Sequence, residues 1–203
     1  MTKYEKCDLI IAAVAAFFTT TAIIWVLFKE TILARWRAPK LQSLINMDMP
    51  YVTKQGRTYY YHLGIKNIGR ATAQNCRGYV DRIYEYNNGQ YERIKNFMPM
   101  PLYWAREEKS ATFIGPDQEK FLDLGTIDTD CSYAVGKRPF VLWFREYSDT
   151  SRLFLGRYKI RIILYSENTE SLPVELYISW SGQAKEEYMD MLKELIISKE
   201  LIK

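Results

Sequence analysis

Alternation of apolar and polar residues with a period of two is the feature that most limits how this chain can fold. In residues 57–67, RTYYYHLGIKN, every second position from Tyr59 to Ile65 is apolar. Residues 156–166 and 174–180 repeat the pattern. A strand that is buried on one face has this spacing, whereas an amphipathic helix has a period of 3.6. These segments are therefore predicted to be β-strands.

Turn residues and further strand patterns extend this prediction. Asn88-Gly89 lies between two extended runs in YEYNNGQYERI, and an Asn-Gly pair tolerates the positive φ angles of a type I′ hairpin turn. Residues 139–144, PFVLWF, are apolar throughout, as in a strand covered on both faces. Weaker strand patterns occupy four further segments: 41–47, 76–86, 91–97 and 120–126. About eight strands without crossover helices predict a mainly β fold, an antiparallel β-sandwich over residues 38–182.

The N-terminal segment, residues 1–37, has a different pattern. Residues Leu9 to Phe28 read LIIAAVAAFFTTTAIIWVLF, without charge, proline or glycine. Twenty helical residues cover roughly 30 Å, the thickness of a bilayer's hydrocarbon core. A cleaved signal peptide would have a shorter apolar run and small residues at its cleavage site. We predict a transmembrane helix in the lipid bilayer, with the hydroxyls of Thr19 to Thr21 bonded to helix carbonyls or to a neighbouring helix.

Charges flanking this span predict its orientation. Lys3 and Lys6 precede the span, and four basic residues follow it: Lys29, Arg35, Arg37 and Lys40. The positive-inside tendency then places the larger domain on the cytoplasmic side of a single-pass membrane protein. The whole chain has 28 basic and 24 acidic residues, and these are interleaved along the sequence. Nucleic acid is therefore an unlikely partner, because a dedicated nucleic-acid binder gathers its positive charge into a patch.

The last segment, residues 183–203, is predicted to be an amphipathic helix with Ser181 or Gly182 at its cap and Glu186 and Glu187 in its first turns. Apolar residues recur there at spacings of three and four: Tyr188, Met191, Leu192, Leu195, Ile196 and Ile202. Such a stripe packs against the helix's own domain or against a partner. For the second alternative the contact residues would be Tyr188, Met191, Leu192 and Leu195.

The stretch LGIKNIGRATAQNCRGYV, residues 63–80, has some features of a phosphate-binding loop. A P-loop requires Gly-x4-Gly-Lys-Ser/Thr between a strand and a helix. Here Gly64 and Gly69 are followed by Arg70-Ala71 and then by another strand pattern, so the motif fails. We expect instead a strand that ends in a tight corner, with an unusual backbone angle at Gly69 and a return strand opening at Asn75-Cys76.

The same stretch resembles the strand-turn-strand signature of CARDB-type immunoglobulin-like modules. In that signature an apolar-x-apolar-x-Asn-x-Gly run precedes a small residue, Ala-x-Asn and a returning strand. YKIRIILYSENTESLPVELYISWSG, residues 158–182, resembles the final hairpin of prokaryotic membrane-anchored proteins with such a domain. The resemblance covers residues 38–182 and implies an Ig-like β-sandwich used for contacts rather than chemistry. Many such modules lie outside the cell, in contrast to the cytoplasmic side that the flanking charges predict here.

Candidate catalytic and metal-binding residues are sparse. His62 is the only histidine, and no serine or cysteine of the chain has a recognisable nucleophile motif. Acidic residues include Asp123, Asp128, Asp130 and Glu146, but IDTDCS lacks the pattern of an EF-hand loop. We therefore expect no catalytic residues, no metal site and no cofactor, and a protein that is not an enzyme.

The three cysteines form no zinc-binding pair, because they lie far apart in the sequence. Cys7 lies at the predicted membrane edge, as a site of reversible acylation or as an inert thiol. Cys76 and Cys131 form a disulfide in an oxidising compartment or stay as two separate thiols in the cytosol.

Aromatic residues are abundant, with sixteen tyrosines and five tryptophans. Tyrosine buries well at protein interfaces, so a membrane-anchored domain that contacts a protein partner is the leading prediction for function. The alternative is a module that binds glycans or nucleic acid through stacked rings and cations. Its predicted contact residues are Tyr60, Tyr79, Arg82, Tyr84, Tyr91 and Arg93.

Overall fold

The computed structural model describes residues 3–29, 37–105, 110–129, 139–142 and 152–201, with side chains from residue 12 onward. The chain divides into two compact units, Met1–Ala38 and Pro39–Lys203. The predicted strands lie in the second unit, which holds the candidate sites.

The first unit contains helix α1, Lys3–Leu27. The hydroxyls of Thr19, Thr20 and Thr21 donate to the carbonyls four residues earlier at 2.7–2.8 Å, as predicted. The described side chains of α1 are exposed, and they include the aromatic rings of Phe17 and Phe18. Across the described residues, no helix is both long enough and apolar enough to cross a membrane. The first three residues of the predicted span, 9–11, lie outside the described side chains.

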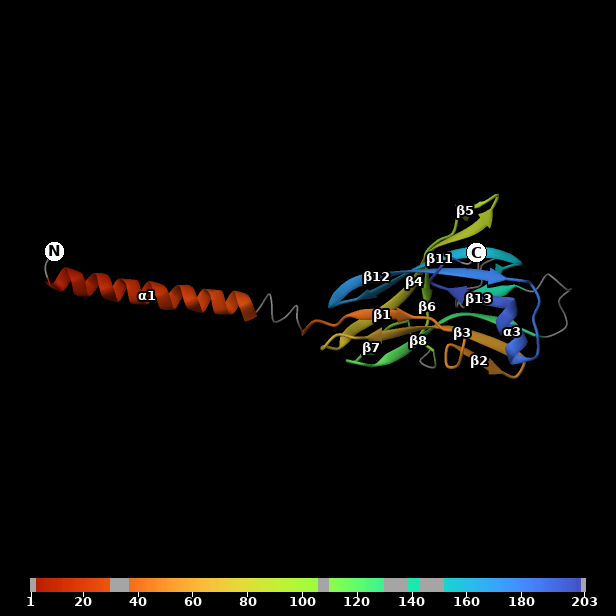
Figure 1. Cartoon of the computed structure of the whole chain (residues 1–203), viewed down its shortest axis with the longest axis horizontal. Coiled ribbons are helices and arrows are strands. Elements are labelled where there is room, and N and C mark those ends of the chain that lie inside the picture. Colours follow the sequence, from red (N-terminus) through yellow and green to blue (C-terminus); the bar gives the residue numbers. More distant parts are fainter. Residues whose placement is uncertain (1–2, 30–36, 106–109, 130–138, 143–151, 202–203) are drawn as a thin grey trace. The chain divides into compact units, whose positions relative to one another are not determined.

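The second unit is mainly β, and its described residues form thirteen antiparallel strands in two sheets (Figure 1). The first sheet contains β1 (Leu41–Leu44), β2 (Val52–Gln55), β3 (Thr58–Asn67), β8 (Glu119–Asp128), β9 (Phe140–Leu142) and β10 (Arg152–Leu153). The second sheet contains β4 (Ala73–Asn87), β5 (Gln90–Arg93), β6 (Met100–Leu102), β7 (Thr112–Ile114), β11 (Gly156–Ser166), β12 (Thr169–Trp180) and β13 (Leu195–Ser198).

The two sheets pack face to face around one apolar core. In the first sheet the order is β1-β3-β8-β9-β10, with β2 also paired to β3. In the second it is β13-β12-β11-β4-β5, with β6 and β7 also paired to β4. Contact between the sheets is close at Gly78 of β4, where an added Cβ would lie 2.8 Å from the Leu122 side chain of β8. The predicted sandwich is thus consistent with the observed two-sheet arrangement.

Two β-bulges decide which side chains face outward. In the pairing of β4 with β11, Ile162 lies opposite Val80 and Arg161 opposite Arg82, so Asp81 is an extra residue. In the pairing of β3 with β8, Leu124 is the extra residue between two successive pairs. An extra residue reverses the alternation beyond it, because successive side chains of a strand point to opposite faces. Both bulges therefore change which side chains reach the core.

Most predicted strands are confirmed, with changes at their ends. The type I′ turn is also confirmed, since β4 and β5 pair from Asn87 to Gln90 and φ is 50° at Asn88 and 90° at Gly89. The number of strands was underestimated, because β2, β6, β7, β10 and β13 have only two to four residues and show little periodicity. The strand predicted at 139–144 is described only to Leu142, and residues 143–144 lie outside the described part.

The corner after β3 is built around a buried asparagine rather than a strained glycine. Gly69 is not among the positive-φ residues, so the prediction for its backbone angle was wrong; the positive φ falls at Asn75, at 50°. The return strand opens at Ala73, two residues earlier than predicted. Asn67 is fully buried and accepts from the N–H groups of Lys40 and Gly69 at 3.1 and 2.9 Å. Its amide nitrogen donates to the carbonyls of Ala71 and Ile114 at 2.7 and 2.9 Å.

Replacement of Asn67 by alanine should destabilise the sandwich. Asn67→Ala removes the partner of several buried polar groups, and the expected loss in the free energy of unfolding is about 2–4 kcal/mol. Urea unfolding followed by tryptophan fluorescence measures this loss. Asn87→Ala, at an exposed position of β4, is the control and should change the midpoint little; equal midpoints for both variants would contradict the role of Asn67.

The C-terminal segment is only partly helical, so the prediction of a helix over 183–203 was wrong in extent. Helix α3 covers Tyr188–Glu194, and residues 195–198 form β13 along the edge of β12. Helix α3 begins after Glu187, without a side-chain cap, so the predicted cap at Ser181 or Gly182 was also wrong. The physical reason is the open edge of β12, whose backbone groups gain partners from a strand but not from a helix.

Alkaline pH should weaken the core at Tyr158, an inward residue of β11. Burial, followed by the neighbouring Glu85, raises the pKa of Tyr158 to about 12. The folded state then holds this proton more tightly than the unfolded chain, whose tyrosine pKa is about 10. The contribution of this proton to the free energy of unfolding is complete below about pH 10. It is lost as the pH rises to about 12, a change of about 2–3 kcal/mol.

Tyr158→Phe removes this ionisable group, so the free energy of unfolding should fall less steeply with pH between about 10 and 12 than in the unmodified chain. The measurement is a series of urea titrations at rising pH. Tyr165→Phe, which changes an exposed residue of the same strand, is the matched control. Identical pH slopes for Tyr158→Phe and the unmodified chain would show that the proton of Tyr158 does not contribute.

Candidate functional site

The outer face of the second sheet gathers tyrosines and basic residues from β4, β5, β11 and β12. We call it the basic face. Register places the following side chains on it: Arg77, Tyr79, Asp81, Arg82, Tyr84, Tyr86, Tyr91, Arg93, Arg157, Lys159, Arg161, Tyr165, Glu175 and Tyr177. The opposite side chains of the same strands, among them Val80 and Ile83, belong to the core.

The basic face has six basic side chains and two carboxylates, an excess of four positive charges. Asp81 lies 3.2 Å from Arg82 and 3.7 Å from Arg161, and Glu175 lies 3.6 Å from Lys159. The other three guanidinium groups have no carboxylate within 4 Å among the described residues: Arg77, Arg93 and Arg157. The face is therefore electrostatically suited to an acidic partner.

The tyrosine rings of the basic face pack against each other and against the cations. Tyr91 contacts Tyr86 and Tyr177 with ring centroids 5.1 and 5.7 Å apart. Lys159 lies 4.6 Å from the ring centroid of Tyr84, and Arg157 lies 5.7 Å from that of Tyr86. Burial, followed by the neighbouring Tyr177, raises the pKa of Tyr91. These rings form a connected aromatic surface whose faces are partly covered by cations.

The structure brings together five of the six contact residues predicted from sequence. Tyr79, Arg82, Tyr84, Tyr91 and Arg93 all lie on the basic face. The sixth, Tyr60, lies on β3 of the first sheet, opposite Thr53 and Thr126, so it belongs to a different surface. The basic face also includes cations that the sequence reasoning missed, and the alternation of β11 around Arg157, Lys159 and Arg161 was the signal that could have identified them.

A second candidate site adjoins the basic face where β12 ends. It is a cavity of about 300 Å³, which we call the α3 pocket, lined by Leu155, Gly156, Arg157, Ser179, Trp180, Ser181, Lys193, Glu194 and Ile196. Arg157, Ser179 and Ile196 form a row across three strands, because Ser179 pairs with both of the other residues. Arg157 belongs to both the α3 pocket and the basic face.

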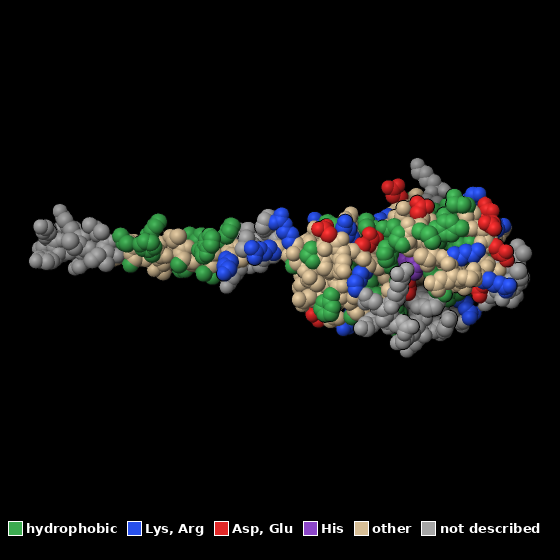
Figure 2. Space-filling model, turned by 90° about the horizontal axis from the view of Figure 1, so that it is seen from below, with side chains coloured by type: hydrophobic (Ala, Val, Ile, Leu, Met, Phe, Trp, Pro, Cys, Tyr) green, Lys and Arg blue, Asp and Glu red, His purple; other side chains and the backbone are tan. Residues whose placement is uncertain are grey.

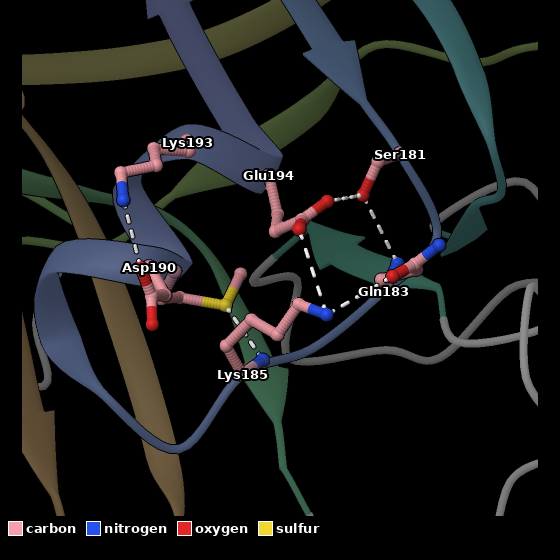
Figure 3. Close-up of polar contacts among 7 residues, drawn as sticks. Ser181, Gln183, Lys185, Asp190, Lys193 and Glu194 are labelled. Carbon is pink, nitrogen blue, oxygen red and sulfur yellow. Dashed lines mark hydrogen bonds and ion pairs between the residues drawn. The ribbon is translucent and has the colours of Figure 1, made fainter.

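Polar contacts hold the loop before α3 in place beside the α3 pocket (Figure 3). Ser181 donates its hydroxyl to the carboxylate of Glu194 and accepts from the N–H of Gln183 at 3.2 Å. The ammonium of Lys185 lies 3.7 Å from the other Glu194 oxygen. On the other side of α3, Lys193 donates to Asp190 at 2.8 Å, and this contact, followed by the charge of Lys193, lowers the pKa of Asp190. Both charged residues from α3 in the pocket lining are thus already paired.

The residues predicted for a partner helix pack on their own domain. Met191 and Leu195 are completely buried, and Tyr188 and Leu192 lie partly buried against the core. Tyr188 stacks on Tyr59 with a centroid distance of 6.2 Å. Met191 and Leu195 cannot contact a partner unless α3 and β13 leave the sandwich.

The outer face of the first sheet contains a hydrogen-bonded series around His62 (Figure 2 shows the histidine in purple). His62 and Asp123 face each other across β3 and β8 because of the bulge at Leu124. The imidazole Nδ1 lies 2.8 Å from Asp123 Oδ1, and Nε2 lies 3.1 Å from Thr53 Oγ1. A carboxylate only accepts, so Nδ1 carries a proton, and in the neutral imidazole Nε2 accepts from the Thr53 hydroxyl.

This series has the order hydroxyl, imidazole, carboxylate that activates a nucleophile in hydrolases. Here His62 is 8% exposed, and its ring packs edge-on against Phe121 with the two ring centroids 6.3 Å apart. Both ring nitrogens are hydrogen-bonded, so the series satisfies a buried polar side chain. We interpret it as a structural network, and the expectation that the protein is not an enzyme remains a prediction.

The other candidate residues stay apart or lie outside the described part. Asp128 is exposed, Cys76 is buried with a free thiol, and Asp130, Cys131 and Glu146 fall outside the described residues. The described residues contain no group of three metal-ligating side chains. Cys76 forms no disulfide with a described residue, and the two alternatives for Cys76 and Cys131 stay predictions because Cys131 lies outside the described part.

Removal of the Asp123 carboxylate should destabilise the first sheet. Asp123→Ala leaves the buried Nδ1–H of His62 without its acceptor, and the free energy of unfolding should fall by about 1–3 kcal/mol. Glu170→Ala, at an exposed position of β12, is the control. Urea unfolding of the two variants separates them; an unchanged midpoint for Asp123→Ala would show that the pair contributes nothing to stability.

Comparison with protein-family models gives no match to the chain, and the search of curated proteins gives none either.

Proposed function

We propose that the protein is a membrane-anchored, non-enzymatic binding protein whose β-sandwich contacts an acidic protein partner through the basic face. The observation that carries the proposal is the uncompensated charge of that face, with three guanidinium groups beyond hydrogen-bond range of any described carboxylate. Exposed tyrosine beside arginine is the composition typical of the energetically important part of protein interfaces.

The proposed anchor is the uncharged run of residues 9–28. Apolar side chains lie on all sides of the described part of α1, and they are exposed. A helix that is hydrophobic all round requires an apolar environment. The flanking charges favour the cytoplasmic side for the sandwich. Anchoring raises the effective concentration of the basic face toward partners in or near the same membrane, so a modest intrinsic affinity suffices.

Assignment of the sandwich to the CARDB-type, Ig-like class is a further part of the proposal. It is supported by the quoted strand-turn-strand stretch and by the observed two-sheet packing. Asn67, the asparagine of that stretch, stabilises the corner after β3 through four hydrogen bonds to backbone groups.

The same face could instead bind glycans or single-stranded nucleic acid by ring stacking. Two observations make this the second candidate. Lys159 and Arg157 already lie over the rings of Tyr84 and Tyr86, and Tyr91 meets Tyr86 and Tyr177 edgewise, at interplanar angles near 60°. A sugar or base would have to displace these neighbours before it could stack.

Photo-crosslinking from the basic face tests the proposal. A photoreactive tyrosine analogue at position 84 of the full chain should crosslink a protein partner in native membranes, whereas the same analogue at position 60, on the other sheet, should not. The Arg77→Glu, Arg93→Glu double variant should reduce the crosslink from position 84 about tenfold or more, because like charges would then meet an acidic partner. Arg152→Glu, an exposed arginine on β10, is the matched control.

Equal crosslinking from positions 60 and 84, or a yield that the double variant leaves unchanged, would refute the basic face as the contact surface. Saturable binding of an oligosaccharide or single-stranded DNA from an array, with no protein crosslink, would favour the second candidate.

A further inference from the structure

Among the described residues, one charged group of the α3 pocket has no carboxylate or cation partner. Lys193 is paired with Asp190 at 2.8 Å, and Glu194 is held by Ser181 and Lys185. Arg157 is exposed and has no carboxylate within 4 Å among the described residues. Its guanidinium lies over the Tyr86 ring, 5.7 Å from the centroid, which restricts where this charge can point.

The remaining walls of the α3 pocket are apolar or carry hydroxyls. Leu155 and Ile196 are 59% and 40% exposed, and the nearly buried Trp180 also belongs to the lining. Ser179 lies between Arg157 and Ile196 in the row across β11, β12 and β13. An apolar group bound there would cover exposed leucine and isoleucine, while its polar end meets the guanidinium.

We propose that the α3 pocket binds a carboxylate that is attached to an apolar side chain or short hydrocarbon group. A guanidinium and a carboxylate match in geometry, since both are planar and form two parallel hydrogen bonds. A single positive charge balances a monoanion. A phosphate dianion fits less well, because Arg157 is the one cation of the lining without a carboxylate partner among the described residues and balances only one of its two negative charges.

The size of the cavity limits the ligand further. About 300 Å³ lies at the lower end of the range for small-molecule pockets. It accommodates one residue-sized group. Two sources provide this chemistry: the C-terminal residue of a polypeptide with an apolar side chain, and a free organic acid of similar size. The shared requirement is the carboxylate beside an apolar group.

Binding to the full chain in detergent or nanodiscs tests the inference with defined probes. The probes are acetyl-Gly-Gly-Leu with a free carboxylate, the same peptide as its C-terminal amide, and N-acetyl-leucine. Both acids, or the peptide acid alone, should bind saturably by calorimetry or by ligand-observed NMR. The amide should bind about tenfold more weakly or not at all, because it lacks the charge that the guanidinium meets. Comparable binding of N-acetyl-leucine and the peptide acid indicates a free acid as ligand, and binding of the peptide alone indicates a chain end.

Variants locate the binding. Arg157→Gln should lower the affinity for both acid probes about tenfold. Ser179→Phe places a large side chain in the cavity from an outward position and should abolish their binding. Arg152→Gln, at an exposed position of β10 outside both the basic face and the α3 pocket, is the matched control and should bind as the unmodified chain does. Tryptophan fluorescence and the urea midpoint confirm that each variant is folded. Equal affinities for acid and amide, or full binding by Arg157→Gln, would overturn the inference.

This inference is independent of the protein partner proposed above. The Arg77→Glu, Arg93→Glu variant should lose the protein crosslink from position 84. It should still bind the small acids with unchanged affinity, because neither residue lines the α3 pocket. A missing crosslink therefore does not argue against binding of the small acids, and missing binding of the acids does not argue against the protein partner.

Discussion

The pairing of β4 with β11 and the bulge at Asp81 determine what this sandwich presents to its surroundings. Val80 and Ile83 both reach the core although three positions separate them, because Asp81 is accommodated as an extra residue. If Asp81 were instead paired in a regular ladder, strict alternation from Val80 would turn Ile83 outward and Arg82 and Tyr84 inward. Burial of a guanidinium in the core would cost several kcal/mol. The hydrophobic core and the basic face therefore depend on the same irregularity.

The C-terminal segment joins the two sheets at one end of the sandwich. β13 completes the edge of β12, and the loop before α3 returns to the first sheet, where the Tyr59 hydroxyl donates to the carbonyl of Glu186 at 2.8 Å. Beyond β13, Lys199 donates to the carbonyl of Ser43 in β1, and burial lowers the pKa of that lysine. Buried Met191 fixes α3 between these points. The α3 pocket is thus built on a clamped segment, which favours a preformed site over one that assembles on binding.

Long strands could be predicted from the sequence because their burial follows a simple rule. β11 alternates over eleven residues, and the Asn88-Gly89 turn follows from the backbone angles that these two residues tolerate. β13 was missed because Leu195 and Ile196 fit a helical stripe as well as a strand, and the choice depended on the open edge of β12. The meeting of His62 with Asp123 depended on the bulge at Leu124, which no local pattern revealed. Composition predicted tyrosine and arginine as candidate contact residues, but only the register assigned Tyr60 to one sheet and Tyr84 to the other.

Thiol accessibility along β4 tests the central claim most directly. Single cysteines at positions 80, 82, 83 and 84, in a chain whose native cysteines are replaced by alanine, would be labelled with a water-soluble maleimide. With the bulge at Asp81, positions 82 and 84 should react rapidly, whereas positions 80 and 83 should be protected. Protection at 80, 82 and 84 together with rapid labelling at 83 would mean that the strand alternates without interruption, and the basic face as described would not exist.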